Sequence, residues 1–246
     1  MNGGSIIFVL AGAVGACAGS FIVTAGMRAA RSEPFLKGRS HCDGCGVTLT
    51  FVQTVPLVSY IGARGRCAAC GAAIDPLHPM AELAGALIAT LPILAATPVR
   101  APLLIATGFC LLASSVVDLR TRRLPDALTV LVAILSAILA FERGALWSGL
   151  FSGGVAFVLL EAVRRGYQRA RGTAGIGFGD VKLVGALAIW LQERSPWVIV
   201  LASILGLALF AIRRPRDGRL AFGPAIAVAA FAVGLLTEAG LLGSAD

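Results

Sequence analysis

The chain has 246 residues, of which 57% are hydrophobic and only 14% charged, and its mean hydropathy is +0.86. This composition excludes an ordinary soluble globule and indicates a polytopic, all-α integral membrane protein. The net charge of +8 suggests nucleic acid at first sight, but the cations gather in the loops on one side of the expected membrane. That pattern explains the charge without a nucleic-acid partner.

Apolar segments in chain order predict about eight transmembrane helices, since a helix needs about 20 apolar residues to cross a bilayer. The first segment carries no Lys or Arg before it, so we expect a retained helix rather than a cleaved signal peptide. With the N-terminus outside, all Lys and Arg residues except Arg100, Arg143 and Arg194 fall in inner loops, which predicts both termini outside. The segments lie near 5–27, 81–97, 101–117, 127–141, 145–163, 181–192, 196–212 and 220–242.

The longest polar interval, residues 28–80, separates a first helix (1–27) from a seven-helix membrane domain (81–246). Two CxxC pairs in this interval, each followed by glycine, look like the two knuckles of a zinc ribbon. Four thiolates would complete a tetrahedral shell around a structural zinc ion. The alternative is a pair of dithiols or disulfides, which the reducing cytoplasm disfavours. The four cysteines are Cys42, Cys45, Cys67 and Cys70.

The stretch LTFVQTVPLVSY between the knuckles could form a short strand pair. The metal would either only keep this loop folded or help it to bind substrate, and the residues leave both open. His41 is expected to be a neighbour of the metal site rather than a fifth ligand. Cys17 and Cys110 lie in apolar segments and are expected to be packing residues.

Three acids near the expected spans have ordinary structural explanations. Glu82 opens the second span, where the helix dipole favours a negative charge. Asp126 follows Pro125 at the start of the fourth span and is expected to be a helix N-cap. Glu161 precedes two arginines at helical spacing, so ion pairing is expected.

Two acids at the inner edge lack such explanations, and acids at membrane depth are costly. Asp118 closes the third span, where the helix dipole disfavours it, and Asp180 opens the sixth span after GIGFG. Two close carboxylates in a partly dry site share a proton. This is the aspartic-protease arrangement, although the sequence does not assign the acid and base roles. Gly177 and Gly179 would give the backbone or a substrate close access to the carboxylate.

Several motifs occur together in a characteristic order: GSF at 19–21, the double CxxC with VPLVSY, PMAEL, DLRTRRLPDALT, GFGDVKL and FGPAIA at 222–227. With them the chain resembles the bacterial type IV prepilin peptidases. These enzymes of the inner membrane cut the leader from prepilins and pseudopilins, then N-methylate the new amino terminus with S-adenosylmethionine. The resemblance implies that Asp118 and Asp180 are catalytic, that Gly177 and Gly179 shape the GxGD turn, and that the four cysteines bind zinc in a cytoplasmic loop. Both termini would then be periplasmic.

One departure concerns the methyltransferase half of this activity. Ile22 and Val23 follow GSF, where the family commonly has a Leu-Asn pair. Cleavage without methylation is therefore an alternative to the bifunctional enzyme. Glu82 matches a family Glu and is a candidate for the methyl-transfer site.

A second alternative is a non-enzymatic scaffold or transporter with a zinc ribbon. It is less favoured, because transporters hold their acids near the bilayer midplane. The expected partners are prepilin or pseudopilin substrates and membrane lipid, not nucleic acid.

Overall fold

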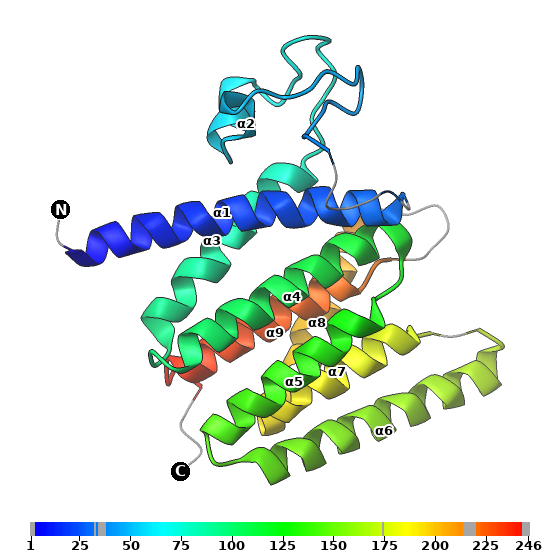
Figure 1. Cartoon of the computed structure of the whole chain (residues 1–246). Coiled ribbons are helices and arrows are strands. Elements are labelled where there is room, and N and C mark those ends of the chain that lie inside the picture. Colours follow the sequence, from blue (N-terminus) through cyan, green and yellow to red (C-terminus); the bar gives the residue numbers. More distant parts are fainter. Residues whose placement is uncertain (1–2, 32, 34–37, 174, 214–219, 243–246) are drawn as a thin grey trace. The chain divides into compact units, whose positions relative to one another are not determined.

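The computed structural model describes residues 3–31, 33, 38–173, 175–213 and 220–242. Every element within these ranges is a helix (Figure 1), which confirms the predicted fold class. Eight of these helices have 14 or more residues: α1 (Gly3–Ala30), α3 (Leu77–Ala95), α4 (Arg100–Thr121), α5 (Asp126–Glu142), α6 (Leu146–Arg171), α7 (Phe178–Leu191), α8 (Ser195–Arg213) and α9 (Gly223–Glu238).

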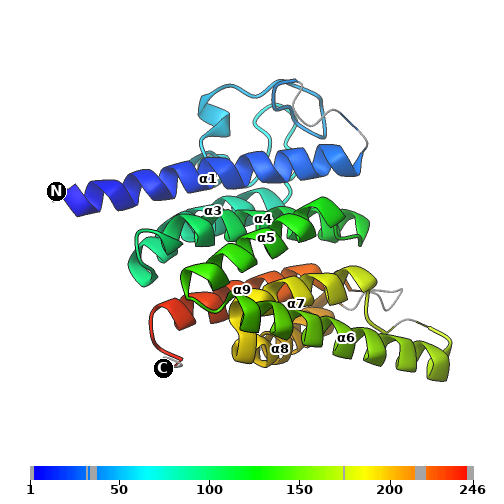
Figure 2. The ribbon, with the colours of Figure 1, turned by 60° about the horizontal axis from the view of Figure 1, so that its bottom comes forward.

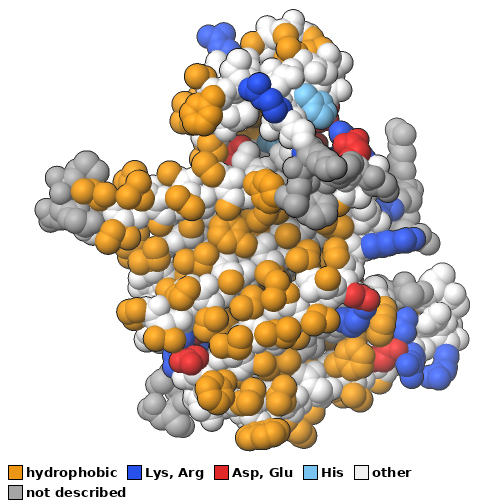
Figure 3. Space-filling model, viewed as in Figure 1, with side chains coloured by type: hydrophobic (Ala, Val, Ile, Leu, Met, Phe, Trp, Pro, Cys, Tyr) orange, Lys and Arg blue, Asp and Glu red, His pale blue; other side chains and the backbone are white. Residues whose placement is uncertain are grey.

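The long helices are apolar enough for a membrane protein. Five segments of the described chain have the length and composition to cross a bilayer: Gly4–Ala30, Leu77–Ala95, Arg100–Thr121, Leu146–Arg171 and Phe178–Ile212. The last of these joins α7 and α8 through a short 3-10 turn, η2 (Gln192–Arg194). On the face that Figure 3 shows, hydrophobic side chains cover most of the surface of the long helices, and charged ones gather toward helix ends. The eight crossings remain a prediction, because α7 with 14 residues is only about 21 Å long.

Two compact units make up the chain, Met1–Leu91 and Pro92–Asp246, which we call the N-terminal and C-terminal units. The N-terminal unit contains α1, a 3-10 turn η1 (Val52–Thr54), α2 (Val58–Gly62) and most of α3. The sequence predicts a different division, into functional regions at 1–27, 28–80 and 81–246. That division stays a prediction.

In the N-terminal unit, α1 and α3 cross in backbone contact. A side-chain carbon added at Gly15 would lie 2.6 Å from the Cβ of Ala89, and one at Gly19 would lie 2.8 Å from the carbonyl carbon of Ala81. Gly85 faces Gly15 just as closely, with 3.0 Å to its carbonyl carbon. Small residues allow membrane helices this approach. The Gly15-x-x-x-Gly19 spacing is the sequence signal for this crossing.

The stretch between the knuckles does not form the strand pair that we considered. It folds into η1 and α2, with α-type hydrogen bonds from the Ser59 and Ile61 amides to the carbonyls of Val55 and Leu57. The described residues form only isolated antiparallel bridges, one in each knuckle: His41 with Thr48 and Arg66 with Ala73. Short-range hydrogen bonds therefore replace strand pairing in this loop.

Helix α7 lies at the centre of the C-terminal unit and packs against α5, α6, α8 and α9, while α4 packs against α5 and α9. Helices α6 and α7 lie side by side in both views of the ribbon (Figure 2). Leu183, Leu187 and Trp190 of α7 are almost completely buried, as expected for a helix that is apolar all round. Cys110 packs against this core as predicted, whereas Cys17 is exposed on α1.

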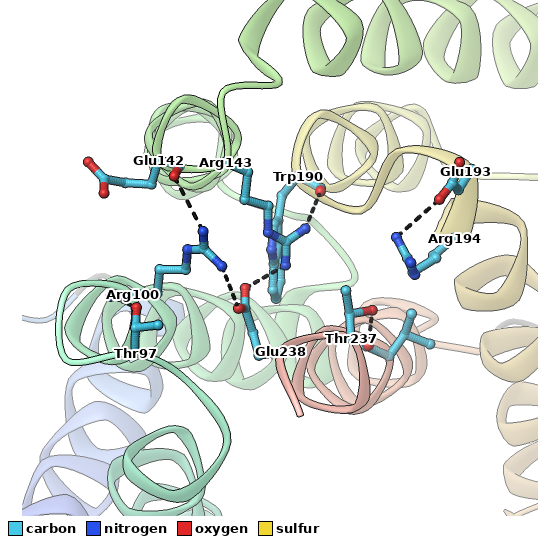
Figure 4. Close-up of polar contacts among 10 residues, drawn as sticks. Thr97, Arg100, Glu142, Arg143, Trp190, Glu193, Arg194, Thr237 and Glu238 are labelled. Atoms are coloured by element: carbon cyan, nitrogen blue, oxygen red, sulfur yellow. Dashed lines mark hydrogen bonds and ion pairs between the residues drawn. The ribbon is translucent and has the colours of Figure 1, made fainter. Parts of the chain in front are cut away.

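A buried ion cluster ties α4, α5 and α9 together at the ends where α9 finishes and α4 begins (Figure 4). The Glu238 side chain is only 3% exposed and pairs with Arg100 at 3.4 Å and Arg143 at 2.5 Å. Arg143 also donates to the Trp190 carbonyl, and Arg100 to the Glu142 carbonyl. A buried charge requires such partners, so this cluster fixes how the helices are aligned.

Candidate active site

The ends of three helices in the C-terminal unit meet around Asp118. This residue lies in the last turn of α4, which ends where Arg122 adopts a left-handed conformation with φ 54° and donates its amide to the Asp118 carbonyl. Asp118 is only 5% exposed. Its Oδ2 accepts a hydrogen bond of 2.9 Å from the backbone amide of Gly223, the first residue of α9. The carboxylate is therefore held in one orientation by a group from another helix.

Asp180 lies in the first turn of α7, where the helix dipole favours a negative charge. It is half-buried, accepts a hydrogen bond from the backbone of Gly177, and is close enough to Asp118 for the two carboxylates to interact electrostatically. The structure thus brings together the two acids that the sequence singled out. They come from helices that are 62 residues apart in the sequence at these positions.

Glycines leave the space that this site needs. A Cβ at Gly177 would lie 2.8 Å from Oδ2 of Asp180, and one at Gly223 would lie 2.8 Å from Oδ2 of Asp118. Gly179 faces Leu124, whose side chain also reaches Gly223, so Leu124 fills the space between the first turns of α7 and α9. Gly177 has a φ of −66°, so the site requires its missing side chain rather than an unusual backbone. Leu124 and the role of Gly223 were not predicted from the sequence; the FGP at the start of the last apolar segment was the available signal.

Cations surround Phe178, which lies between Gly177 and Gly179. The Arg164 guanidinium and the Lys182 ammonium lie 5.2 and 5.0 Å from the centre of its ring, within cation–π range. Lys182 also pairs with Asp126. Asp126 is therefore not the helix N-cap that we expected, because that position belongs to Pro125 and Asp126 is the first residue of α5.

Glu161 of α6 has the structural role that its spacing predicts. Arg164 donates to both of its carboxylate oxygens at 2.7 Å, and Arg165 donates to one of them at 2.7 Å. The ion pairing predicted for this acid is confirmed. Glu161 is buried, and its oxygens are occupied by arginines rather than presented for catalysis.

The four predicted cysteine ligands lie together in the N-terminal unit, with their sulfur atoms all within 4.8 Å of one another. Cys42 Sγ and Cys70 Sγ are 3.8 Å apart. A disulfide would require about 2.05 Å, whereas sulfurs bound to one tetrahedral zinc at about 2.3 Å are separated by about 3.8 Å. The donor set therefore fits a metal ion, and His41 lies outside it.

The two knuckles repeat the same backbone geometry 25 residues apart. The Gly46 amide donates to the Cys42 carbonyl and the Gly71 amide to the Cys67 carbonyl, both at 2.8 Å. Gly46 and Gly71 have φ values of 72° and 71°, a left-handed conformation that favours glycine. The glycine after each CxxC pair is thus explained by the turn that closes the knuckle.

Backbone amides and crowding set the ionisation of the sulfurs. The amides of Cys70 and Ala69 lower the pKa of the Cys67 thiol to about 6. The amide of Ala72 lowers the pKa of Cys70, but the thiol of Cys45, burial and the other sulfurs raise it on balance to about 11. Without a cation, one thiolate in the cluster therefore disfavours the next. A bound metal ion would remove this conflict.

Glu82 of α3 is buried in the N-terminal unit, and both of its carboxylate oxygens accept hydrogen bonds. Ser20 Oγ donates to Oε1 at 2.8 Å, and the Leu57 amide donates to Oε2 at 2.7 Å. Ser20 and Glu82 line a cavity of about 540 Å³ together with Arg28 and Tyr60. The candidate methyl-transfer residue therefore lies in the wall of a sizeable pocket.

Two family models match successive parts of the chain. The family model described as Bacterial Peptidase A24 N-terminal domain matches residues 13–96, and the one described as Type IV leader peptidase family matches residues 105–211. No solved structure gives a significant match.

Three similar proteins are each named prepilin leader peptidase/N-methyltransferase. The one from Burkholderia pseudomallei is 37% identical over 77% of this chain, which spans 64% of that relative's length. Those from Pseudomonas aeruginosa and Neisseria gonorrhoeae are 33% and 31% identical, over 77% and 82% of this chain and 69% and 73% of theirs. The chain belongs to the type IV leader peptidase family.

Proposed function

We propose that the protein is a membrane aspartic endopeptidase that cleaves the leader peptide of type IV prepilins or pseudopilins and then N-methylates the new amino terminus. The observation that carries the peptidase half is the convergence of Asp118 and Asp180 from the ends of α4 and α7, where Leu124 contacts both Gly179 beside Asp180 and Gly223 beside Asp118. The names of the relatives support both halves. They do not favour a scaffold, a transporter or a cleavage-only enzyme.

In this proposal the two carboxylates share one proton and act as a pair. The ionised one takes a proton from water, and the protonated one polarises the scissile carbonyl as the water attacks. The proton taken from water then passes to the leaving amine as the C–N bond breaks. The Gly223 amide keeps Asp118 oriented for these transfers, and Gly177 leaves room for Asp180.

The site is assigned to the cytoplasmic edge of a bacterial inner membrane, with both termini periplasmic. The positive-inside rule supports this, because Arg120, Arg122 and Arg123 follow Asp118, and further arginines end α6. A prepilin would keep its apolar stem in the bilayer and its leader in the cytoplasm, with the cleavage site between them. Arginines at this edge are also suited to contact lipid headgroups.

We assign a structural zinc ion to the four cysteines. The sulfur spacing and the paired knuckles support tetrahedral thiolate coordination. The ion would join two knuckles that are separated by 21 residues of chain, in a loop too small to fold well alone. Metal analysis of the purified protein tests this directly.

Methyl transfer is assigned to the first helix and the loop 28–80, together with Glu82, and proteolysis to the rest of 81–246. The cavity of about 540 Å³ has the size of a small-molecule site, and its lining combines carboxylates with arginines, among them Glu33 and Arg66. S-adenosylmethionine, when bound, would supply a methyl group on a positively charged sulfur. The residues of α1 that line the cavity are Ser20, Thr24, Met27 and Arg28. Val23 is fully buried instead, so its departure from the family pattern takes no side chain out of the pocket.

Mass spectrometry of a pilin amino terminus, after co-expression with the enzyme, tests both halves at once. The wild type is expected to give a shortened, methylated product. Replacing Asp118 or Asp180 with Asn is expected to lower cleavage by roughly 10²- to 10⁴-fold, because a proton-transfer group is lost. Glu193→Gln, at the opposite end of α7, is the matched control. Normal leader removal by either Asn variant would refute the pair.

A further inference from the structure

We infer that Glu82 is a positioning residue that fastens the loop between the two knuckles onto α1 and α3, rather than a proton acceptor for the substrate amine. The inference rests on the proposed methyl-transfer function and gives Glu82 a specific part in it. Three elements of the N-terminal unit meet at this one side chain.

The hydrogen bonds of Glu82 leave little freedom to its carboxylate. Oε1 accepts from Ser20 of α1 at 2.8 Å and Oε2 from the Leu57 amide of the loop at 2.7 Å, and the residue is only 7% exposed. Hydrogen bonds to an ionised acceptor are among the stronger ones in proteins. Without the carboxylate, the Ser20 hydroxyl and the Leu57 amide would each need another hydrogen-bond acceptor. Glu82 therefore bridges α1 and the loop through one carboxylate.

The close crossing of the two helices brings Glu82 to Ser20. A Cβ at Gly19 would lie 3.2 Å from the Cα of Glu82, so the absence of a side chain at Gly19 allows this approach. Ser20 is the next residue on α1 and reaches the carboxylate directly. The hydrogen bond between Ser20 and Glu82 is thus set by the rigid pair of helices α1 and α3.

The hydrogen bond between Glu82 and the Leu57 amide holds a strained turn. Leu57 has φ 61° and ψ −48°, a conformation that residues other than glycine rarely adopt. The Val58 amide donates to the Pro56 carbonyl at 2.6 Å across it, which closes a three-residue γ-turn. Such strain persists only where the surroundings hold it, and the Leu57 amide is bound by Glu82. Since α2 begins at Val58, this contact sets where α2 starts.

The same contact shapes the cavity. Ser20 and Glu82 line it from the helices, and Val55, Val58, Ser59 and Tyr60 line it from the loop. Release of Leu57 would let the loop and α2 move away from the helices and would open the pocket. Both oxygens of Glu82 are engaged in holding this wall.

The positioning role and a proton-acceptor role differ for the amide variant. Glu82→Gln keeps a carbonyl oxygen that can accept from the Leu57 amide, and its NH₂ group can donate a hydrogen bond to Ser20 Oγ. Both contacts of the side chain therefore survive while the basic carboxylate is lost. Glu82→Ala removes both contacts. Leu57→Gly keeps the amide and adopts the positive φ without strain. Met80→Ala, at an exposed residue of α3 that does not line the cavity, serves as the control.

The experiment uses the full-length protein in detergent and measures leader cleavage, amino-terminal methylation and hydrogen exchange of the Leu57 amide. Glu82→Ala is expected to speed exchange at Leu57 and to lower methylation, each by about tenfold or more, with cleavage little changed. Glu82→Gln, Leu57→Gly and Met80→Ala are expected to stay within about threefold of the wild type in both Leu57 exchange and methylation.

If Glu82→Gln loses methylation as fully as Glu82→Ala while Leu57 exchange stays slow, Glu82 acts as a base and the inference is overturned. Unchanged exchange in Glu82→Ala overturns it as well. If the wild type cleaves but does not methylate, the proposed methyltransferase function fails. The exchange measurements then still decide whether Glu82 holds the loop.

Discussion

The cysteine cluster and the carboxylate pair are assembled in opposite ways. Each cysteine knuckle is closed by backbone hydrogen bonds within about seven residues, Cys42–Thr48 and Cys67–Ala73. The carboxylate site instead collects Asp118, Asp180 and Gly223 from three helix ends spread over more than 100 residues. The first site depends on local turns and a shared ion, and the second on the packing of a whole bundle. Substitutions should therefore affect them through different routes.

Removal of the metal should separate the two sites most completely. The double variant Cys42→Ser, Cys67→Ser is expected to lose all bound zinc, because it leaves only one thiolate in each knuckle. The contacts that we describe around Asp118 all come from the C-terminal unit, so cleavage should change by less than about threefold. Elemental analysis and a cleavage assay on the same preparation measure both. Wild-type zinc content would refute the metal site, and abolished cleavage would show that the sites are not independent.

The ion cluster at Glu238 tests the dependence of the carboxylate site on the bundle. Arg143→Ala leaves a carboxylate that is 3% exposed with one partner fewer, which is expected to cost about 3–5 kcal/mol of stability. Thermal unfolding in detergent measures this loss. Adding Glu238→Gln should recover part of it, because it removes a buried charge that would otherwise be left with only Arg100, at 3.4 Å. The cysteine cluster should keep its zinc in both variants; equal stability of Arg143→Ala and wild type would contradict the prediction.

Gly223→Ala tests the carboxylate site more locally. The new Cβ would lie 2.8 Å from Oδ2 of Asp118, so the carboxylate must turn away. Cleavage is expected to fall by about tenfold, equivalent to about 1.4 kcal/mol in the barrier. Gly166→Ala is the matched control, because a Cβ there meets nothing within 4 Å. Equal cleavage rates of the two variants would show that the Gly223 contact does not orient Asp118.

Acid should affect the cysteine site gradually. Thiolates bind metal and thiols do not, and backbone amides from Cys70 and Ala69 lower the pKa of Cys67 to about 6. A lowered pKa keeps this ligand ionised down to a lower pH, and bound zinc competes with protons for the thiolates, so zinc should stay bound at neutral pH and be released only below about pH 6. A zinc-sensitive dye in a pH titration follows the release. Complete release of zinc at neutral pH would show that the lowered pKa of Cys67 does not help to retain the ion.

The sequence predicted the parts of the molecule that depend on local pattern. The four cysteines could be predicted as candidate ligands from their spacing, and Asp118 and Asp180 as candidate catalytic residues from the cost of an acid at a membrane edge. The amide of Gly223 could not, because every residue except proline carries the same donor and only the fold selects one. The Asp126 pairing with Lys182 depends on helices 56 residues apart. The loop between the knuckles was misjudged because its hydrogen bonds are helical although its composition suits strands.

The glycine crossing of α1 and α3 affects how mutational data on this protein should be interpreted. Any missense change at Gly15, Gly19 or Gly85 adds a carbon atom against the neighbouring backbone, so these positions should tolerate substitution as poorly as the carboxylates. If the proposed peptidase function holds, a mutational scan scored only by leader cleavage would place them beside Asp118 as equally essential. Scoring protein abundance in parallel should separate them, since the glycine variants would disappear from the membrane and the aspartate variants would remain.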